Sequence, residues 1–191
     1  MFVLGDTMKD LWQHQKIAVT KARQYKSLAL FFDVGTGKSR TMIQILREDY
    51  TIHNGIRNTL IFAPISVCPG WVTEFGKYSK VPEEQIHVLL GDGKKKIATL
   101  QKILDRGEKC IVITNYESVQ NESYYKLLHK FAPEILISDE CHRLKDSTSV
   151  RAKLIYQLSD KAERKFGLTG TPMPNGMEDL FGQNRFQTLI S

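Results

Sequence analysis

Cysteine is scarce in this sequence and is not arranged for a disulfide or a metal. The 191 residues include only Cys68, Cys110 and Cys141, which are far apart and have no CxxC spacing. An odd, scattered set fits a reducing compartment better than a disulfide framework, and it argues against structural zinc. We therefore expect a cytoplasmic or nucleoid-associated protein, or a nuclear one in a eukaryotic or viral setting.

Long apolar runs, repeats and low-complexity stretches are missing as well. No run approaches the roughly 18 apolar residues of a membrane-spanning helix, and the first residues lack the basic start of a signal peptide. With 41% hydrophobic and 25% charged residues, the composition argues against disordered, collagen-like and membrane classes. An ordinary globular domain is the class that remains.

The charge balance is basic. The formal net charge of +6 suits a polyanionic partner, although many enzymes that never touch nucleic acid are also basic. The one charge run of note, at 94–96, is explained equally well as a solvated helix face. Charge alone therefore gives weak support for nucleic-acid binding.

Short apolar runs alternate with segments that are long enough for helices. The first run, at 27–32, is continuously apolar, as expected of a parallel strand buried on both faces. Similar runs follow at 59–64, 86–90, 110–114, 134–138 and, more weakly, 165–169. With helices expected at 10–25 and 38–48, this alternation predicts an α/β domain with a parallel sheet and functional loops at the carboxyl ends of its strands.

A glycine-rich segment, DVGTGKS at 33–39, follows the first predicted strand. Its glycines let backbone N–H groups wrap phosphate oxygens, Lys38 offers an ammonium group and Ser39 can ligate Mg²⁺. A strict GxxxxGK[ST] motif needs glycine where Phe32 stands, so the match is to a looser form. A glycine turn that caps a helix by chance remains an alternative.

Two adjacent carboxylates, Asp139 and Glu140, come directly after the apolar run 134–138. Asp139 is suited to hold Mg²⁺ through water, and Glu140 to polarise an attacking water. A solvated turn is the alternative, and Cys141 and His142 lack further ligands at metal-binding spacing. Because phosphoryl transfer needs phosphate cradle, metal and acid in one place, we expect the two motifs on neighbouring strand ends.

Six segments together resemble the first motor lobe of superfamily-two helicases, and within that group the Swi/Snf-type translocases. In chain order they are LWQHQ (11–15), DVGTGKS (33–39), APIS (63–66) with Trp71, Glu74 and Phe75, TNYE (114–117), DECHRLKD (139–146) and LTGTPMPN (168–175). The resemblance spans nearly the whole chain. It implies a three-layer α/β/α RecA-like P-loop domain that uses ATP and Mg²⁺.

The resemblance also implies a role for each matching residue. The expected roles are adenine contact for Gln15; phosphate binding for Gly35, Thr36, Gly37, Lys38 and Ser39; Mg²⁺ binding for Ser39 and Asp139; catalysis for Lys38, Asp139 and Glu140; coupling of hydrolysis to movement for His142, Thr169, Gly170 and Thr171; and nucleic-acid contact for Ser66, Thr114 and Arg143.

Several of these residues have plainer alternative roles. Ser66 and Thr114 are equally suited to be helix caps, and Arg143 and Lys145 to be ordinary surface charges. Trp71 is expected to be a buried helix anchor and not a platform for stacked bases.

The family pattern is broken at a few positions. Trp12 stands where a basic residue is usual, and His14 where an aromatic one is common, which suggests an altered adenine pocket. Pro174 replaces a residue that is often glutamine in chromatin remodellers. The proline favours the smaller bacterial, viral or annealing-type members.

We interpret residues 1–191 as a single N-terminal ATP-binding lobe, with the second RecA-like lobe absent from this chain. The predicted function is coupling of Mg-ATP hydrolysis to movement on DNA, preferentially duplex DNA, with poor turnover by the isolated lobe. A nucleic-acid-binding scaffold with a structural ATP site is the alternative. A small P-loop kinase would leave the LTGTP segment without a purpose.

Overall fold

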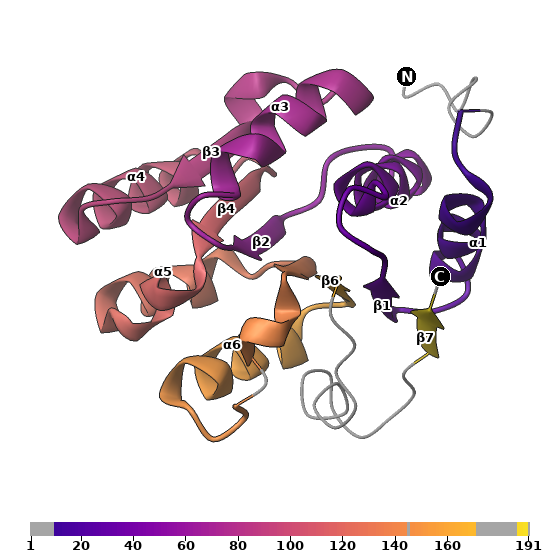
Figure 1. Ribbon diagram of the computed structural model, residues 1–191. Helices are drawn as coiled ribbons and strands as arrows, with labels where there is room; N and C mark the ends of the chain where they lie inside the picture. The colour runs from indigo at the N-terminus through magenta and orange to yellow at the C-terminus, as the bar shows by residue number, and fades with distance from the viewer. Residues whose placement is uncertain (1–9, 145, 171–186, 191) are drawn as a thin grey trace.

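The computed structural model describes residues 10–144, 146–170 and 187–190. Helices and strands alternate along the chain (Figure 1). Their order is α1 Gln13–Ala22, β1 Ser27–Phe31, α2 Lys38–Ile52, β2 Thr59–Ala63, α3 Cys68–Tyr78, β3 Ile86–Leu89, α4 Gly93–Arg106, β4 Ile111–Asn115, α5 Glu122–Phe131, β5 Ile135–Asp139, α6 Val150–Lys161, β6 Arg164–Thr169 and β7 Gln187–Ile190.

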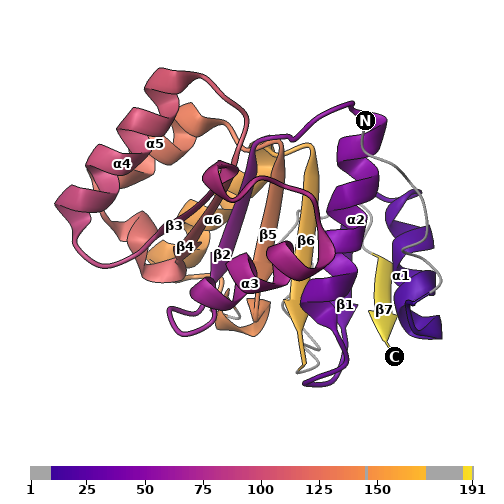
Figure 2. The same cartoon turned by 90° about the horizontal axis from the view of Figure 1, so that it is seen from above.

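One sheet of seven strands, in the order β3-β4-β2-β5-β6-β1-β7, forms the centre of the domain (Figure 2). The described pairs are all parallel. The six apolar runs correspond to β1 through β6, which confirms the predicted α/β class. β7, which pairs with β1, was not predicted.

The helices form a layer on each face of the sheet. Residues of α1, α2 and α3 share one hydrophobic cluster with alternate strand residues such as Leu28 and Leu30. Residues of α4, α5 and α6 share a second cluster with the intervening ones, such as Ala29 and Phe31. Because successive strand residues point to opposite faces, β1 needs apolar residues throughout. None of the described helices is both long and apolar enough to cross a membrane.

Since the strands are parallel, their carboxyl ends lie at one edge of the sheet. The described residues that follow β1, β2, β4 and β5, with Gly170 after β6, therefore lie at this edge, and with the strand ends they include all or part of every sequence motif except LWQHQ, which lies at the start of α1. The expectation that β1 and β5 are neighbours is wrong, because β6 lies between them and pairs with both. The end of β6 is thus placed between the phosphate-loop motif and the acid pair.

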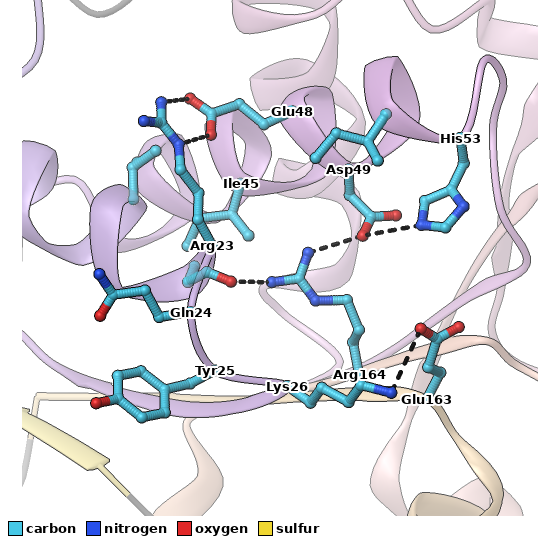
Figure 3. Close-up of a pocket in the computed structure, with 13 residues that line it drawn as sticks. Arg23, Gln24, Tyr25, Lys26, Ile45, Glu48, Asp49, His53, Glu163 and Arg164 are labelled. Carbon is cyan, nitrogen blue, oxygen red and sulfur yellow. Dashed lines mark hydrogen bonds and ion pairs between the residues drawn. The ribbon is translucent and has the colours of Figure 1, made fainter.

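The opposite edge of the sheet, where the strands begin, has a pocket of about 250 Å³ lined by charged residues (Figure 3). Arg23 forms two hydrogen bonds with the Glu48 carboxylate, at 2.7 and 2.8 Å. Arg164 at the start of β6 pairs with the buried Asp49 of α2 at 2.7 Å and donates to the carbonyl oxygen of Ala22. These pairs connect α1, α2 and β6.

Candidate functional site

The loop after β1 has the backbone geometry of a phosphate cradle. Gly35 and Gly37 adopt positive φ values of 83° and 85°, a region that side chains disfavour. Gly37 is the N-cap of α2, so the first backbone N–H groups of this helix and the positive end of its dipole face the loop. Lys38 Nζ donates to the carbonyl oxygens of Phe32 at 3.0 Å and Asp33 at 3.4 Å, which places the ammonium group over the loop.

Gln15 connects α1 to this loop. Its side chain is 3% exposed, its Oε1 accepts from the Trp12 N–H at 3.0 Å, and its Nε2 donates to the Thr36 carbonyl at 3.1 Å. The His14 ring lies 3.2 Å from the same carbonyl. A Cβ at Gly37 would lie 2.4 Å from Gln15 Nε2, so the glycine lets the amide approach the loop. Contact of Gln15 with adenine stays a prediction.

Asp139, the last residue of β5, is 4% exposed and is held from two sides. The Trp71 indole N–H donates to its Oδ2 at 2.9 Å, and the Tyr116 hydroxyl donates to its backbone carbonyl at 2.6 Å. Burial raises the pKa of Asp139 to about 6; Glu140 adds to this rise, while the Trp71 hydrogen bond and the Lys38 charge oppose it. A cation at Asp139 would replace the solvation that burial removes.

Glu140, His142 and Thr169 form a cluster at the ends of β5 and β6. His142 Nδ1 lies 3.2 Å from a Glu140 carboxylate oxygen and 3.1 Å from the Thr169 hydroxyl, which in turn donates to that carboxylate at 3.5 Å. Glu140 has a φ of 53°, uncommon for a side chain with a Cβ and typical of functional positions. Glu140 is therefore in direct contact with two of the predicted coupling residues, His142 and Thr169.

The end of β6 also packs closely on the phosphate loop. A Cβ at Gly170 would lie 3.4 Å from the Phe32 carbonyl oxygen and 3.5 Å from Lys38 Nζ. The end of β6 is thus close to both the lysine, through Gly170, and the Glu140 carboxylate, through Thr169. Thr171, Pro174 and Lys145 lie outside the described residues.

The structure separates the three predicted nucleic-acid contacts. Ser66 and Arg143 are exposed on the loops after β2 and β5. Thr114 is 0% exposed within β4, and its hydroxyl donates to the Leu89 carbonyl at 3.0 Å, so its side chain is not at the surface as the predicted contact requires. Neither Ser66 nor Thr114 caps a helix: Val67 precedes α3, and Thr114 lies inside a strand.

Sequence reasoning missed two supports of the site. Trp71 is 1% exposed, which confirms the predicted buried anchor, but its hydrogen bond to Asp139 was not foreseen. The contact of Tyr116 was not foreseen either. Trp71 and Tyr116 both lie in segments that resemble family motifs. The direction of a buried donor, however, depends on the fold and is not visible in the sequence. No cluster of three potential metal ligands occurs among the described residues, and the thiol of Cys141 is buried.

Comparison with known proteins agrees with this geometry. The model of the SNF2-related domain matches residues 12–186. The chain belongs to the SNF2-related domain family. The match includes all of the site motifs and most of the chain.

Individual relatives of this SNF2-related domain are much longer. A probable ATP-dependent DNA helicase of Arabidopsis thaliana, CHR12, is 32% identical over 81% of this chain and 14% of its own length. The Homo sapiens SWI/SNF-related matrix-associated actin-dependent regulator of chromatin subfamily A member 1 is 27% identical, with the same coverage. The chain thus spans about 14% of these relatives.

A solved structure supports the fold of the SNF2-related domain. The Sulfolobus solfataricus SWI2/SNF2 ATPase core, determined in complex with double-stranded DNA, has a TM-score of 0.69 and 24% sequence identity to this chain. The likeness covers 90% of this chain and 34% of that one. It confirms the predicted RecA-like architecture.

Proposed function

We propose that this SNF2-related domain is the ATP-binding first lobe of a DNA-dependent ATPase that moves along duplex DNA. The observation that carries the proposal is the contact among Glu140, His142 and Thr169, at 3.1 to 3.5 Å, beside the loop that contains Lys38. A phosphate cradle, a water-orienting acid and the predicted coupling residues Thr169 and Gly170 thus share one edge of the sheet. The names and titles of the relatives agree with this function.

The chain's own residues fit Mg-ATP. The N–H groups of the loop and Lys38 are placed to bind phosphate oxygens. Ser39 in the first turn of α2 and the buried Asp139 would hold Mg²⁺, directly or through water. Mg-ATP, when bound, supplies the reacting phosphate and the charge that neutralises its oxygens.

Glu140 is the group that would orient and deprotonate the attacking water. Its carboxylate is partly exposed, so water can reach it, and its orientation is fixed by His142 and the Thr169 hydroxyl. A change at the γ-phosphate would therefore be felt by Thr169 and by the segment after β6. This contact is the route by which hydrolysis would act on movement.

We further propose two partners. Duplex DNA would run along the loops at the carboxyl edge, where Ser66 and Arg143 are exposed. A second RecA-like lobe, normally in the same polypeptide, would close over ATP. Because arginines supplied by a partner are worth roughly 10³ to 10⁵ in rate in phosphoryl transfer, we expect slow turnover by this lobe alone.

The test is a direct titration of Mg-ATP together with hydrolysis assays. Lys38→Ala should abolish binding, whereas Glu140→Gln should leave binding intact and stop hydrolysis in the two-lobe motor. Unchanged binding by Lys38→Ala would exclude this ATP site.

Hydrolysis should also be measured alone and with duplex DNA, single-stranded DNA and RNA. If the second lobe is needed for catalysis, the chain should bind ATP but hydrolyse it at a rate near background with every polymer. Salt-sensitive DNA binding that is indifferent to ATP would favour the scaffold alternative.

A further inference from the structure

A groove of about 370 Å³ lies on the flank of α2, and of its lining residues only Leu11, in the LWQHQ segment, belongs to a motif of the predicted ATP site. Three parts of the chain line it: the residues before α1, one face of α2 and the end of α3 with the turn that follows. The lining residues are Asp10, Leu11, Arg40, Gln44, Arg47, Lys77, Tyr78, Ser79 and Lys80. We call this the flank groove.

The flank groove is strongly basic. Four of its lining residues are cations, Arg40, Arg47, Lys77 and Lys80, and one, Asp10, is a carboxylate. Lys77 pairs with Glu74 at 3.1 Å, and a lysine in the last turn of a helix is favourable in any case. The positions of Arg40 and Arg47 are not explained by the helix dipole, because these residues lie in the first and third turns of α2.

Neither arginine of the flank groove forms an ion pair within the part of the chain that the structure describes. Arg47 Nη1 donates to the neutral amide of Gln44 at 3.3 Å. The Arg40 guanidinium lies 4.9 Å from the centre of the Tyr78 ring. Glu48, the acid beside Arg47 in sequence, is already bound by both donors of Arg23. Two guanidinium groups therefore keep free donors.

The placement of these two side chains favours a shared ligand. Arg40, Gln44 and Arg47 are spaced four and three residues apart, so they lie along one face of α2. Burial lowers the pKa of Arg47 although the charge of Glu48 acts to raise it, which means that the guanidinium group is desolvated at a cost that Glu48 does not fully offset. An anion in the groove would remove that penalty.

The pocket at the opposite edge of the sheet provides the contrast (Figure 3). Its arginines, Arg23 and Arg164, already pair with Glu48 and Asp49. A ligand there would have to displace a formed ion pair. Of these two hollows, the flank groove is the one that combines basic charge with guanidinium groups that form no ion pair among the described residues.

We propose that the flank groove is a second phosphate-binding site, and that it takes a phosphodiester of nucleic acid. A planar guanidinium donates in parallel to two phosphate oxygens, which is why arginine is favoured for this ligand. The inference that the phosphate belongs to DNA rests on the proposed function. The inference that the groove binds phosphate rests on its arginines alone. A strand held here would contact the helix whose first turn carries Lys38 and Ser39.

The first experiment compares Arg47→Gln/Lys80→Gln with Arg106→Gln/Lys102→Gln. The control pair removes one arginine and one lysine from the exposed side of α4, in the layer on the other face of the sheet. Binding of a labelled duplex is measured by anisotropy over a range of salt concentrations. Each phosphate contact contributes about 0.9 to the slope of log K against log salt, so the groove variant should lower the slope by about 1 to 2. Identical slopes for the two double variants would overturn the inference.

The second experiment separates the sources of phosphate. Inorganic tripolyphosphate is titrated into Lys38→Ala, which lacks the loop lysine, and into the same variant with Arg47→Gln/Lys80→Gln. We expect at least a tenfold loss of tripolyphosphate affinity in the latter, with equal urea midpoints as the folding control. If tripolyphosphate affinity is lost as expected but the wild-type chain binds no DNA, the groove is still a phosphate site, and the proposed function on DNA is wrong. If the groove variant instead loses adenosine and keeps tripolyphosphate, the groove belongs to the nucleotide site and the inference is wrong.

Discussion

At the scale of single residues, the carboxylate of Asp139 depends on a neighbour far away in sequence. Trp71 lies in α3, sixty-eight positions earlier, and donates its only polar hydrogen to Oδ2. This bond favours the ionised carboxylate against the effect of burial. The backbone N–H of Glu140 and the charge of Lys38 act in the same direction.

Trp71→Phe should weaken the Mg²⁺-dependent part of nucleotide binding roughly tenfold, because a hydrogen bond to a charged group is worth about 1.5 to 3 kcal/mol. Binding measured in EDTA should be unchanged, since Asp139 then has no cation to hold. Tyr125→Phe is the control, because it also removes a hydrogen-bond donor from an aromatic side chain, here one of α5 whose hydroxyl donates to Gln157 at 2.9 Å. Equal losses with and without Mg²⁺ would mean that Trp71 only supports the fold.

Asp139→Asn should raise the stability of the metal-free chain at neutral pH. The pKa of Asp139 rises from 3.8 to about 6 on folding, so its contribution is fully favourable below 3.8 and is lost as the pH rises through 6. The variant should therefore exceed the wild type by about 3 kcal/mol above pH 7, since a tenfold change in proton affinity is worth about 1.4 kcal/mol. Urea unfolding at pH 4, 5, 6 and 8 measures this, and a pH-independent difference would contradict it.

At the scale of elements, the Gln15 side chain connects α1 to the phosphate loop, and Gly37 leaves the space that this contact needs. Gly37→Ala should destabilise the chain more than Gly35→Ala. Both positions have positive φ, but only at Gly37 would the new methyl meet Gln15, at 2.4 Å. Displacing the amide removes its bond to Thr36, a loss of about 1 kcal/mol.

Urea unfolding of the two alanine variants gives the comparison directly. Adding Gln15→Ala to each should remove the difference between them, because the clash and the hydrogen bond then no longer exist. A difference that persists in the double variants would place the strain elsewhere in the loop.

The strands were predicted best, because their burial is visible in the local sequence. Six strands were visible as apolar runs, because a parallel strand is buried on both faces. Helix ends were less accurate: α1 begins at Gln13 and not Asp10, and α2 continues to Ile52. β7, with four residues, offers too short a pattern to be recognised and exists through its pairing with β1.

At the scale of the whole molecule, the two edges of the sheet have different roles. The carboxyl edge carries the reactive motifs. The amino edge carries a charge network in which Asp49 pairs with Arg164 at 2.7 Å and Arg57 at 3.4 Å, and Arg57 also pairs with Glu163 and Glu134. This network joins α2 to the starts of β5 and β6.

Asp49→Asn should lower the free energy of unfolding by about 3 kcal/mol or more, because it leaves two largely buried guanidinium groups without their shared carboxylate. Asp160→Asn is the control, since Asp160, which pairs with Lys165 at 3.5 Å, has a side chain that is 66% exposed, and its loss should cost less than about 1 kcal/mol. Nucleotide affinity of the folded chain should be unchanged in both, because the network lies at the other edge. A selective loss of nucleotide binding in Asp49→Asn would show that the edges are coupled.

The single-lobe interpretation, the partners and the cellular location stay predictions, since the relatives are far longer than this chain. The chemistry of the ATP site was readable because phosphate loops and acid pairs need fixed residue types at adjacent positions. The sequence by itself therefore determined the fold class and the family, and it singled out the site residues, whose roles stay predictions.

Only the tertiary structure decided how these residues meet. It placed β6 between β1 and β5, so that Thr169 and Gly170 lie between the acid pair and Lys38. It also buried Thr114 and directed Trp71 at Asp139. Strand order and the direction of a buried side chain depend on contacts between residues distant in sequence, and no local pattern encodes them.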